Sequence, residues 1–304
     1  MYALAEPARQ VDSGWLQTIA FAAHQTEFSG TFVYQHGNHV ETSRIVHVVD
    51  DHGEHERLES LDGPHREVIR SNGQVWCVLG DHQGARIEKG RDRRAFPDLL
   101  PEQLTALNQN YLIREGERAR VAGYEAQAIL FQPRDGLRYA HKMWAHLDSG
   151  LLLKSVMLDE RGLAVEQYAF TELKLSGNID RSWIAASKIP PEVLRQENAV
   201  PAKPGISVWR VDALPAGFKK VSEMQRAFRE RKTPVIHQVY TDGLAGISVF
   251  IEPERRGGEG LGLTSHGAIN IYNRSVDGYR ITVVGEVPAR TVVQVADSVR
   301  YTGQ

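Results

Sequence analysis

Histidine is the residue type in this chain best suited to hold a metal ion or move a proton, and there are twelve of them. Two pairs share one spacing, His36-x-x-His39 and His52-x-x-His55. Zinc sites need such ligands on rigid elements, whereas both pairs fall at expected turn tips between strands. The sequence contains no HExxH segment. We therefore predict that these histidines lie on solvated turns and bind no metal.

Other catalytic patterns are missing from the sequence. Cys77 is the only cysteine, and its apolar neighbours favour a buried structural thiol over a nucleophile. No GxSxG segment occurs. The glycines of Gly257–Gly262 are followed by Thr264–Gly267 and then by an expected strand at Ala268–Asn273, not by the helix that a dinucleotide site requires, and Glu259 would repel phosphates. We predict a non-enzymatic protein without a cofactor, because a hydrolase would need a nucleophile and a base.

A basic segment with apolar residues lies in the C-terminal third. Its cationic residues surround Phe218, Met224 and Phe228, and they are Lys219, Lys220, Arg226, Arg229, Arg231 and Lys232. Such a mixture can hold an acidic amphipathic peptide or a lipid headgroup. It can equally be a solvated hairpin with its apolar residues in the core. The formal net charge of −2 argues against a general nucleic-acid binder.

The segment that organises the chain is a three-stranded meander over Arg138–Phe170. We expect strands at Arg138–His146, Leu151–Leu158 and Leu163–Leu175, with Asp- and Gly-containing turns between them. Apolar residues occupy both faces of the second strand, so both faces should be covered. A curved sheet of this kind can hold an acyl chain, or it can be filled by its own side chains.

The rest of the N-terminal region predicts a larger antiparallel sheet. A helix over about 13–25 comes first, with an apolar stripe at Trp15, Ile19 and Ala22/Ala23. Turn signals every 8–12 residues then separate short strands, which is typical of an all-β barrel or sandwich. A short helix is expected at 100–104, with Pro101 in its first turn.

The predicted domain organisation has three parts. Residues 1–185 form the large β domain, residues 186–205 a Pro-rich linker, and residues 206–304 a small α+β domain. The last domain ends in a helix after Pro288. No run of 18 apolar residues is present, so no membrane-spanning helix is expected.

Several motifs together resemble the RseB/MucB family of periplasmic regulators of the envelope-stress sigma factor. The likeness spans nearly the whole chain and keeps the order of its elements. The motifs are Ser29–Tyr34, Glu59–Pro64, Phe96–Pro101, Arg120–Tyr124, Gly150–Ser155 and Tyr279–Pro288.

This resemblance implies a mainly β fold, with a LolA/LolB-like unclosed antiparallel β-barrel followed by a smaller α+β domain. It further implies a periplasmic protein that binds the periplasmic part of a membrane-spanning anti-sigma factor of the RseA/MucA type and shields it from site-1 proteolysis. Lipid or lipopolysaccharide would release the partner, with a change in homo-oligomeric state. Export also fits the small-x-small residues Ala3 and Ala5. The alternative is a periplasmic carrier of lipid or lipoprotein.

Two sets of site residues follow from these expectations. Acyl chains should contact the N-terminal sheet at Trp76, Trp144, Leu151, Leu153 and Phe170. The anti-sigma segment should contact the C-terminal domain at Arg226, Phe228, Arg229, Arg231, Arg255 and Arg256.

Overall fold

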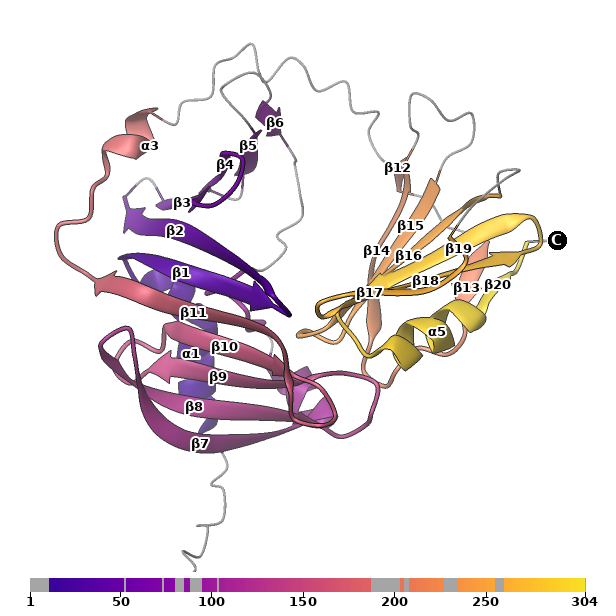
Figure 1. The fold of residues 1–304 in the computed structure, drawn as a ribbon, viewed down its shortest axis with the longest axis horizontal. Helices are drawn as coiled ribbons and strands as arrows, with labels where there is room; N and C mark the ends of the chain where they lie inside the picture. The colour runs from indigo at the N-terminus through magenta and orange to yellow at the C-terminus, as the bar shows by residue number, and fades with distance from the viewer. Residues whose placement is uncertain are drawn as a thin grey trace, which may run out of the picture.

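The computed structural model describes residues 11–51, 53–72, 74–79, 85–87, 95–102, 104–186, 203–204, 208–226, 235–254 and 260–303. These residues form two main β-sheets of different size, each with its own hydrophobic core (Figure 1).

The N-terminal sheet has 11 strands in the order β6-β5-β4-β3-β2-β1-β11-β10-β9-β8-β7, and every neighbouring pair is antiparallel. Because β6 and β7 lie at opposite edges, the curved sheet does not close into a barrel (Figure 1). This confirms the unclosed antiparallel architecture. The strands are β1 (Phe28–His36), β2 (His39–Asp50), β3 (Gly53–Ser60), β4 (Arg66–Ser71), β5 (Gln74–Leu79), β6 (Ala85–Ile87), β7 (Tyr111–Val121), β8 (Tyr124–Pro133), β9 (Ala140–His146), β10 (Leu152–Leu158) and β11 (Ala164–Leu175).

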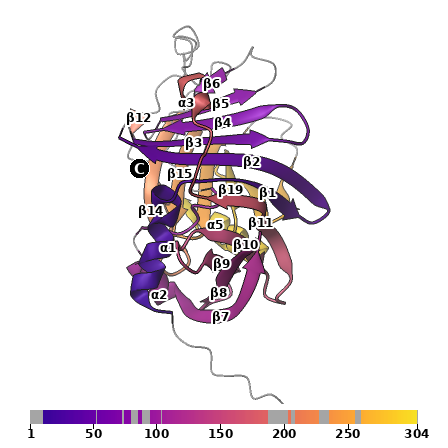
Figure 2. The same ribbon diagram turned by 90° about the vertical axis from the view of Figure 1, so that its left-hand side faces the viewer.

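Helix α1 (Ser13–Gln25) packs against one face of this sheet, which we call the inner face (Figure 2). Asp12 caps the helix, since its side chain accepts a hydrogen bond from the Trp15 amide at 3.0 Å. Leu16 and Ile19 are buried in the N-terminal core. Gly150, in the turn before β10, has a φ of +76° and lies directly against Ile19. A residue without a side chain is therefore needed where the turn meets the helix.

The segment 95–102 and helix α2 (Thr105–Asn110) follow β6. The expected helix at 100–104 is wrong, because the described residues 100–102 are not helical and the helix begins at Thr105. Phe96 instead anchors the segment to the inner face, where its ring lies 5.1 Å from the rings of both Phe32 and Phe170. The short helix α3 (Ser182–Ala186) packs its Trp183 against the opposite, outer face.

The C-terminal sheet has seven strands in the order β12-β14-β15-β16-β19-β18-β17. Helix α5 (Ala289–Asp297) contributes Val292 and Val295 to its core, and Pro288 precedes the helix as predicted. The strands are β12 (Lys203–Pro204), β14 (Lys219–Arg226), β15 (Val235–Thr241), β16 (Gly246–Pro253), β17 (Gly262–His266), β18 (Ile269–Val276) and β19 (Tyr279–Gly285). A separate two-stranded sheet joins β13 (Trp209–Val211) to β20 (Val299–Tyr301).

Most of the expected linker, at 187–202 and 205, lies outside the described residues.

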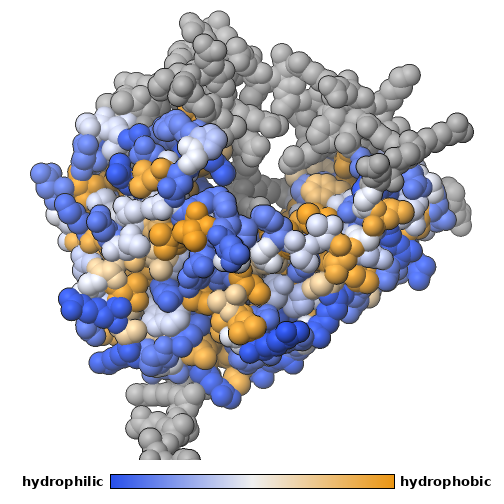
Figure 3. Space-filling model, in the orientation of Figure 1, coloured by the Kyte–Doolittle hydropathy of each residue, from blue (hydrophilic) through white to orange (hydrophobic). Residues whose placement is uncertain are grey.

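On the face seen in Figure 3, hydrophobic residues are scattered in small groups among hydrophilic ones. Within the described residues, no helix has the length and hydropathy needed to cross a bilayer.

Candidate functional site

A cavity of about 490 Å³ lies between the inner face of the N-terminal sheet and the C-terminal domain. Leu244, Ile269 and Glu286 line it from the C-terminal domain. The other lining residues come from the N-terminal domain, and they are Phe32, Tyr34, Glu41, Ser43, Leu58, Ser60, Arg66, Val68, Arg70, Ala95, Phe96, Leu99, His141, Met143, Ser155, Met157, Glu166 and Tyr168. The volume falls in the range of small-molecule pockets, about 300–1,000 Å³.

The cavity wall combines apolar area with a few charged groups. Met143 and Met157 are adaptable apolar side chains from neighbouring strands. Arg66 and Arg70 come from β4, and Arg70 is paired with Glu56. The Tyr34 hydroxyl donates to Glu166 at 3.0 Å. Burial and this carboxylate raise the pKa of Tyr34, so its hydroxyl stays protonated. The wall therefore suits a ligand with an apolar body and a polar or anionic group.

Strand periodicity decides which predicted lipid residues share this face. On β10, Ser155 and Met157 line the cavity, whereas Leu153 lies at the register shift between Leu152 and Lys154, where simple alternation does not apply. On β11, Tyr168 lines it, and Phe170 has the same orientation. Leu151, Leu153 and Phe170 are nevertheless at most 3% exposed in the core beneath α1 and Phe96. None of the three is among the residues that line the cavity.

The two predicted tryptophans lie on the outer face. Trp76 pairs in register with Ile69 and packs in a cluster with Val48 and Trp183. Trp144 follows the cavity-lining Met143 and therefore points away from it. The ammonium groups of Lys142 and Lys154 lie 4.9 and 5.0 Å from the Trp144 ring. As lipid contacts, all five residues stay predictions, and the sequence did not single out the residues of the cavity wall.

An ionic cluster ties the segment 95–102 to α1. His24 at the end of α1 lies 3.0 Å from Glu54 and 3.5 Å from Asp98. Hydrogen bonds to Asp98 and Glu54 raise the pKa of His24 to about 10. Burial opposes the charge of Glu54, but hydrogen bonds from His24 and His47 lower its pKa to about 2. Opposite charges thus hold the segment that supplies Ala95, Phe96 and Leu99 to the cavity.

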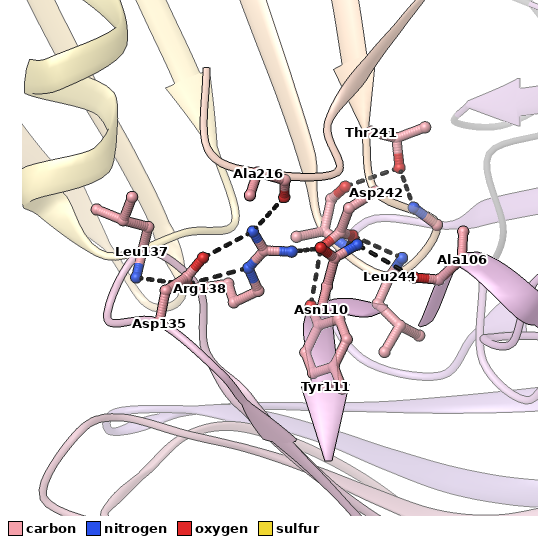
Figure 4. Close-up of polar contacts among 12 residues, drawn as sticks. Ala106, Asn110, Tyr111, Asp135, Leu137, Arg138, Ala216, Thr241, Asp242 and Leu244 are labelled. Carbon is pink, nitrogen blue, oxygen red and sulfur yellow. Dashed lines mark hydrogen bonds and ion pairs between the residues drawn. The ribbon is translucent and has the colours of Figure 1, made fainter. Parts of the chain in front are cut away.

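A buried ion pair joins the two domains (Figure 4). Arg138, before β9, donates to Asp242 at 2.6 Å, and both side chains are at most 1% exposed. Arg138 also donates to Asp135 and to the Ala216 carbonyl, and Tyr111 donates to Asp242 at 3.1 Å. Burial opposes the charge of Arg138, but the carboxylates of Asp242 and Asp135 outweigh it and raise its pKa. The Arg138 guanidinium is therefore charged, and it donates to oxygen atoms from both domains.

Further contacts extend this junction. Asn270 donates to the Tyr139 hydroxyl at 3.0 Å, and Ala268 packs with Tyr139 and Met157. At the start of α5, Thr291 donates to the Leu137 carbonyl at 2.8 Å, and Arg290 is paired with Glu160. The C-terminal domain is thus fixed against the loops that flank β9, β10 and β11.

The histidines differ from the sequence prediction. His36 and His55 are 9% and 7% exposed, so the expectation of solvated turns is wrong for both. His36 is covered by a turn of the C-terminal domain, which a pattern local to its own hairpin could not reveal. His39 is exposed, and His52 lies outside the described residues.

Cys77 is only partly buried on β5. No three His, Cys, Asp or Glu residues in the described part of the chain are arranged to hold a metal ion.

One of the six predicted partner-binding residues lies in a described strand. Arg226 ends β14, and nothing is described of its side chain. The others, Phe228, Arg229, Arg231, Arg255 and Arg256, lie outside the described residues. These six residues stay predictions.

Both domains of the chain match models of one protein family. Residues 12–188 match the model of the MucB/RseB N-terminal domain, and residues 203–300 match that of the MucB/RseB C-terminal domain. The chain belongs to the MucB/RseB family. It is 33% identical to the sigma factor AlgU regulatory protein MucB of Pseudomonas aeruginosa, over 98% of this chain and 94% of that protein.

Two solved structures of MucB are also similar to the chain. A crystal structure of MucB in complex with MucA(peri) has a TM-score of 0.76 at 32% identity, covering 96% of this chain and 99% of that one. A crystal structure of MucB has a TM-score of 0.63 at 31% identity, with coverage of 95% and 97%. The TM-score is thus higher for MucB in the complex than for the other MucB structure.

Proposed function

We propose that this protein is a periplasmic regulator that binds the periplasmic region of a membrane-spanning anti-sigma factor. Binding protects that region from site-1 proteolysis. Lipid or lipopolysaccharide entering the cavity between the domains releases the partner, and the oligomeric state changes with release.

The observation that carries this proposal is the full-length similarity to MucB in complex with MucA(peri). The match covers both domains, so it includes their relative placement as well as their separate folds. A partner held across two domains is sensitive to anything that changes the junction. The cavity lies at that junction, which is where a ligand can favour one domain arrangement over another.

Calorimetric titration tests the coupling directly. The full chain would be titrated with the periplasmic segment of the cognate anti-sigma factor, with and without lipopolysaccharide fragments. We expect the segment to bind and the fragments to weaken its binding. If the segment bound equally well with saturating fragments, lipid-triggered release would be wrong.

The cavity itself can be tested by reversing one of its charges. Arg66 is exposed on β4 and lines the cavity, so Arg66→Glu should weaken the binding of an anionic lipid about tenfold or more. Arg114→Glu is the matched control, because Arg114 is exposed on β7 and is not among the lining residues. Equal loss in both variants would mean that overall charge, and not the cavity, governs lipid binding.

The predicted partner residues need a separate measurement. A variant with Arg226→Glu, Arg229→Glu and Arg231→Glu should bind the anti-sigma segment more weakly than the wild type does. Reversal of three charges in an interface changes both attraction and desolvation. Unchanged affinity would remove this basic segment from the proposed interface.

The second candidate function is a carrier of lipid or lipoprotein. The cavity volume of about 490 Å³ and its mixed wall favour it. A carrier would hand lipid to an acceptor and would not bind the anti-sigma segment. Lipid binding without peptide binding in the titration above would therefore select this alternative.

A further inference from the structure

Three histidines from the two domains meet at the junction. His36 ends β1 and His39 begins β2, at the tip of one hairpin, while His266 ends β17 in the C-terminal domain. The ring centroid of His36 lies 4.9 Å from that of His39 and 4.7 Å from that of His266. Figure 1 shows the tips of the β1–β2 and β17–β18 hairpins side by side between the domains.

The C-terminal hairpin covers His36 closely. Gly267, in the β17–β18 turn, has a φ of +59°, and a Cβ added there would lie 3.0 Å from Cβ, Cγ and Nδ1 of His36. His36 is 9% exposed as a result. A positive charge on its imidazole would lose most of its hydration and would face two further imidazoles.

The charged and titratable groups around His36 come from several elements. Glu41 on β2 is hydrogen-bonded to His39 at 2.7 Å and is the one carboxylate among the groups shifting the pKa of His36. Tyr34 on β1 lies 5.3 Å from the His36 ring. Glu166 on β11 and Glu286 after β19 act on the Tyr34 hydroxyl. Burial has the largest effect and lowers the pKa of His36, and the charges of His266 and His39 lower it further. The carboxylate of Glu41 acts in the opposite direction but does not outweigh them.

We propose that His36, His39 and His266 form a proton-sensitive contact that holds the two domains closed over the cavity near neutral pH and releases them in acid. The ligand in this proposal is a proton and not a metal ion, because no three His, Cys, Asp or Glu residues in the described ranges are arranged to hold a metal ion. The cavity wall includes Tyr34, Glu41 and Ile269 from the elements that carry the cluster, so release would open the cavity. This inference goes beyond the proposed function and requires neither the anti-sigma factor nor lipid.

The direction of the pH effect follows from linkage. His36 resists protonation when the domains are closed and regains its ordinary pKa of 6.5 when they separate. The neutral His36 ring therefore stabilises the closed arrangement fully above pH 6.5. This stabilisation is lost as the pH falls from 6.5 through the lowered pKa that His36 has in the closed arrangement. For each proton taken up on opening, the ratio of open to closed molecules rises by up to about tenfold per pH unit.

Small-angle X-ray scattering of the full chain tests this proposal. The radius of gyration would be followed from about pH 8 to about pH 5, across the range where histidine titrates. The buffer would contain EDTA, to exclude metal bound by the imidazoles, and about 0.15 M salt to fix screening. Circular dichroism would confirm that both sheets stay folded.

Four proteins give a complete set of outcomes. The wild type should expand below about pH 6.5, and so should the control His65→Gln, whose histidine is partly exposed at the β3–β4 turn. The neutral variant His36→Gln/His266→Asn should stay compact. His266→Lys should be expanded already at about pH 8, because it fixes a positive charge against His36.

Three results would each overturn the proposal, and the first two concern acid expansion. One is a wild type that stays compact throughout while its circular dichroism spectrum remains native. The other is acid expansion in the neutral variant equal to that of the wild type, which would place the titrating group elsewhere. A compact His266→Lys at about pH 8 would likewise contradict it.

Discussion

Single histidines in this protein have opposite electrostatic roles, and their neighbours decide which. His24 faces Asp98 and Glu54, which stabilise its charged form. His36 and the cavity-lining His141 are buried, and burial lowers the pKa of both, to about 4 for His141. The surroundings of one residue type thus favour the charged form beside α1 and the neutral form at the cavity and the junction.

The His24 cluster predicts a specific dependence of stability on pH. Because the pKa of His24 is raised from 6.5 to about 10, its contribution is complete below pH 6.5 and is lost as the pH rises through 10. We expect His24→Gln to lower the free energy of unfolding by about 1 kcal/mol at neutral pH, a small value because both partners keep contact with water. Thermal unfolding at a series of pH values measures this difference.

The decisive comparison is between the two pH profiles. The gap between wild type and His24→Gln should close toward about pH 10, whereas a gap of constant size would mean that the substitution only disturbs packing. The contribution of Glu54 behaves in the opposite sense. It is present above its ordinary pKa of 4.5 and lost as the pH falls through about 2.

At the scale of elements, the position of α1 depends on a single glycine in the turn before β10, Gly150. A Cβ at Gly150 would lie 3.1 Å from Cγ2 of Thr18 and 3.2 Å from the backbone nitrogen of Ile19. Gly150→Ala should therefore cost about 2–4 kcal/mol, from left-handed backbone strain plus overpacking against the helix. Urea unfolding followed by tryptophan fluorescence gives the value.

Gly162 is the matched control for that substitution. Its φ is +75°, nearly that of Gly150, but an added Cβ would meet nothing within 4 Å. Gly162→Ala should thus cost only the backbone strain, about 1–2 kcal/mol. If both variants lost the same stability, the contact between the turn and α1 would contribute nothing.

Elements with a local pattern could be predicted from the sequence, and those decided by distant contacts could not. The meander and α1 were predicted because turn residues and the 3.6-residue period are local signals. Strand β17 was missed, since Leu263 and its neighbours are exposed and show no alternation. The cavity wall was also missed, because its composition depends on how the C-terminal domain sits over β1, β4, β9 and β11. The Arg138–Asp242 pair spans 104 positions, and no sequence pattern links the two residues.

At the scale of the whole molecule, the Arg138–Asp242 pair is a buried ionic contact between the two domains. Breaking a buried ion pair from one side leaves an uncompensated charge, which typically costs about 3–5 kcal/mol. Arg138→Met would leave the Asp242 carboxylate without its cationic partner. This carboxylate is 0% exposed and lies between Tyr111 and the β15–β16 turn. We expect the two domains then to unfold in separate calorimetric transitions instead of one.

Removing both charges should be milder than removing one. In Arg138→Met/Asp242→Asn the turn keeps an oxygen to accept the amides of Leu244 and Ala245, and no buried charge is left. The double variant should therefore recover part of the loss, with an interaction energy of about 1–3 kcal/mol in the double-mutant cycle. Additive losses would show that the two side chains act independently. The junction would then rest on its other contacts, including Asn270–Tyr139, the start of α5 and the histidine cluster, and acid alone should separate the domains more readily.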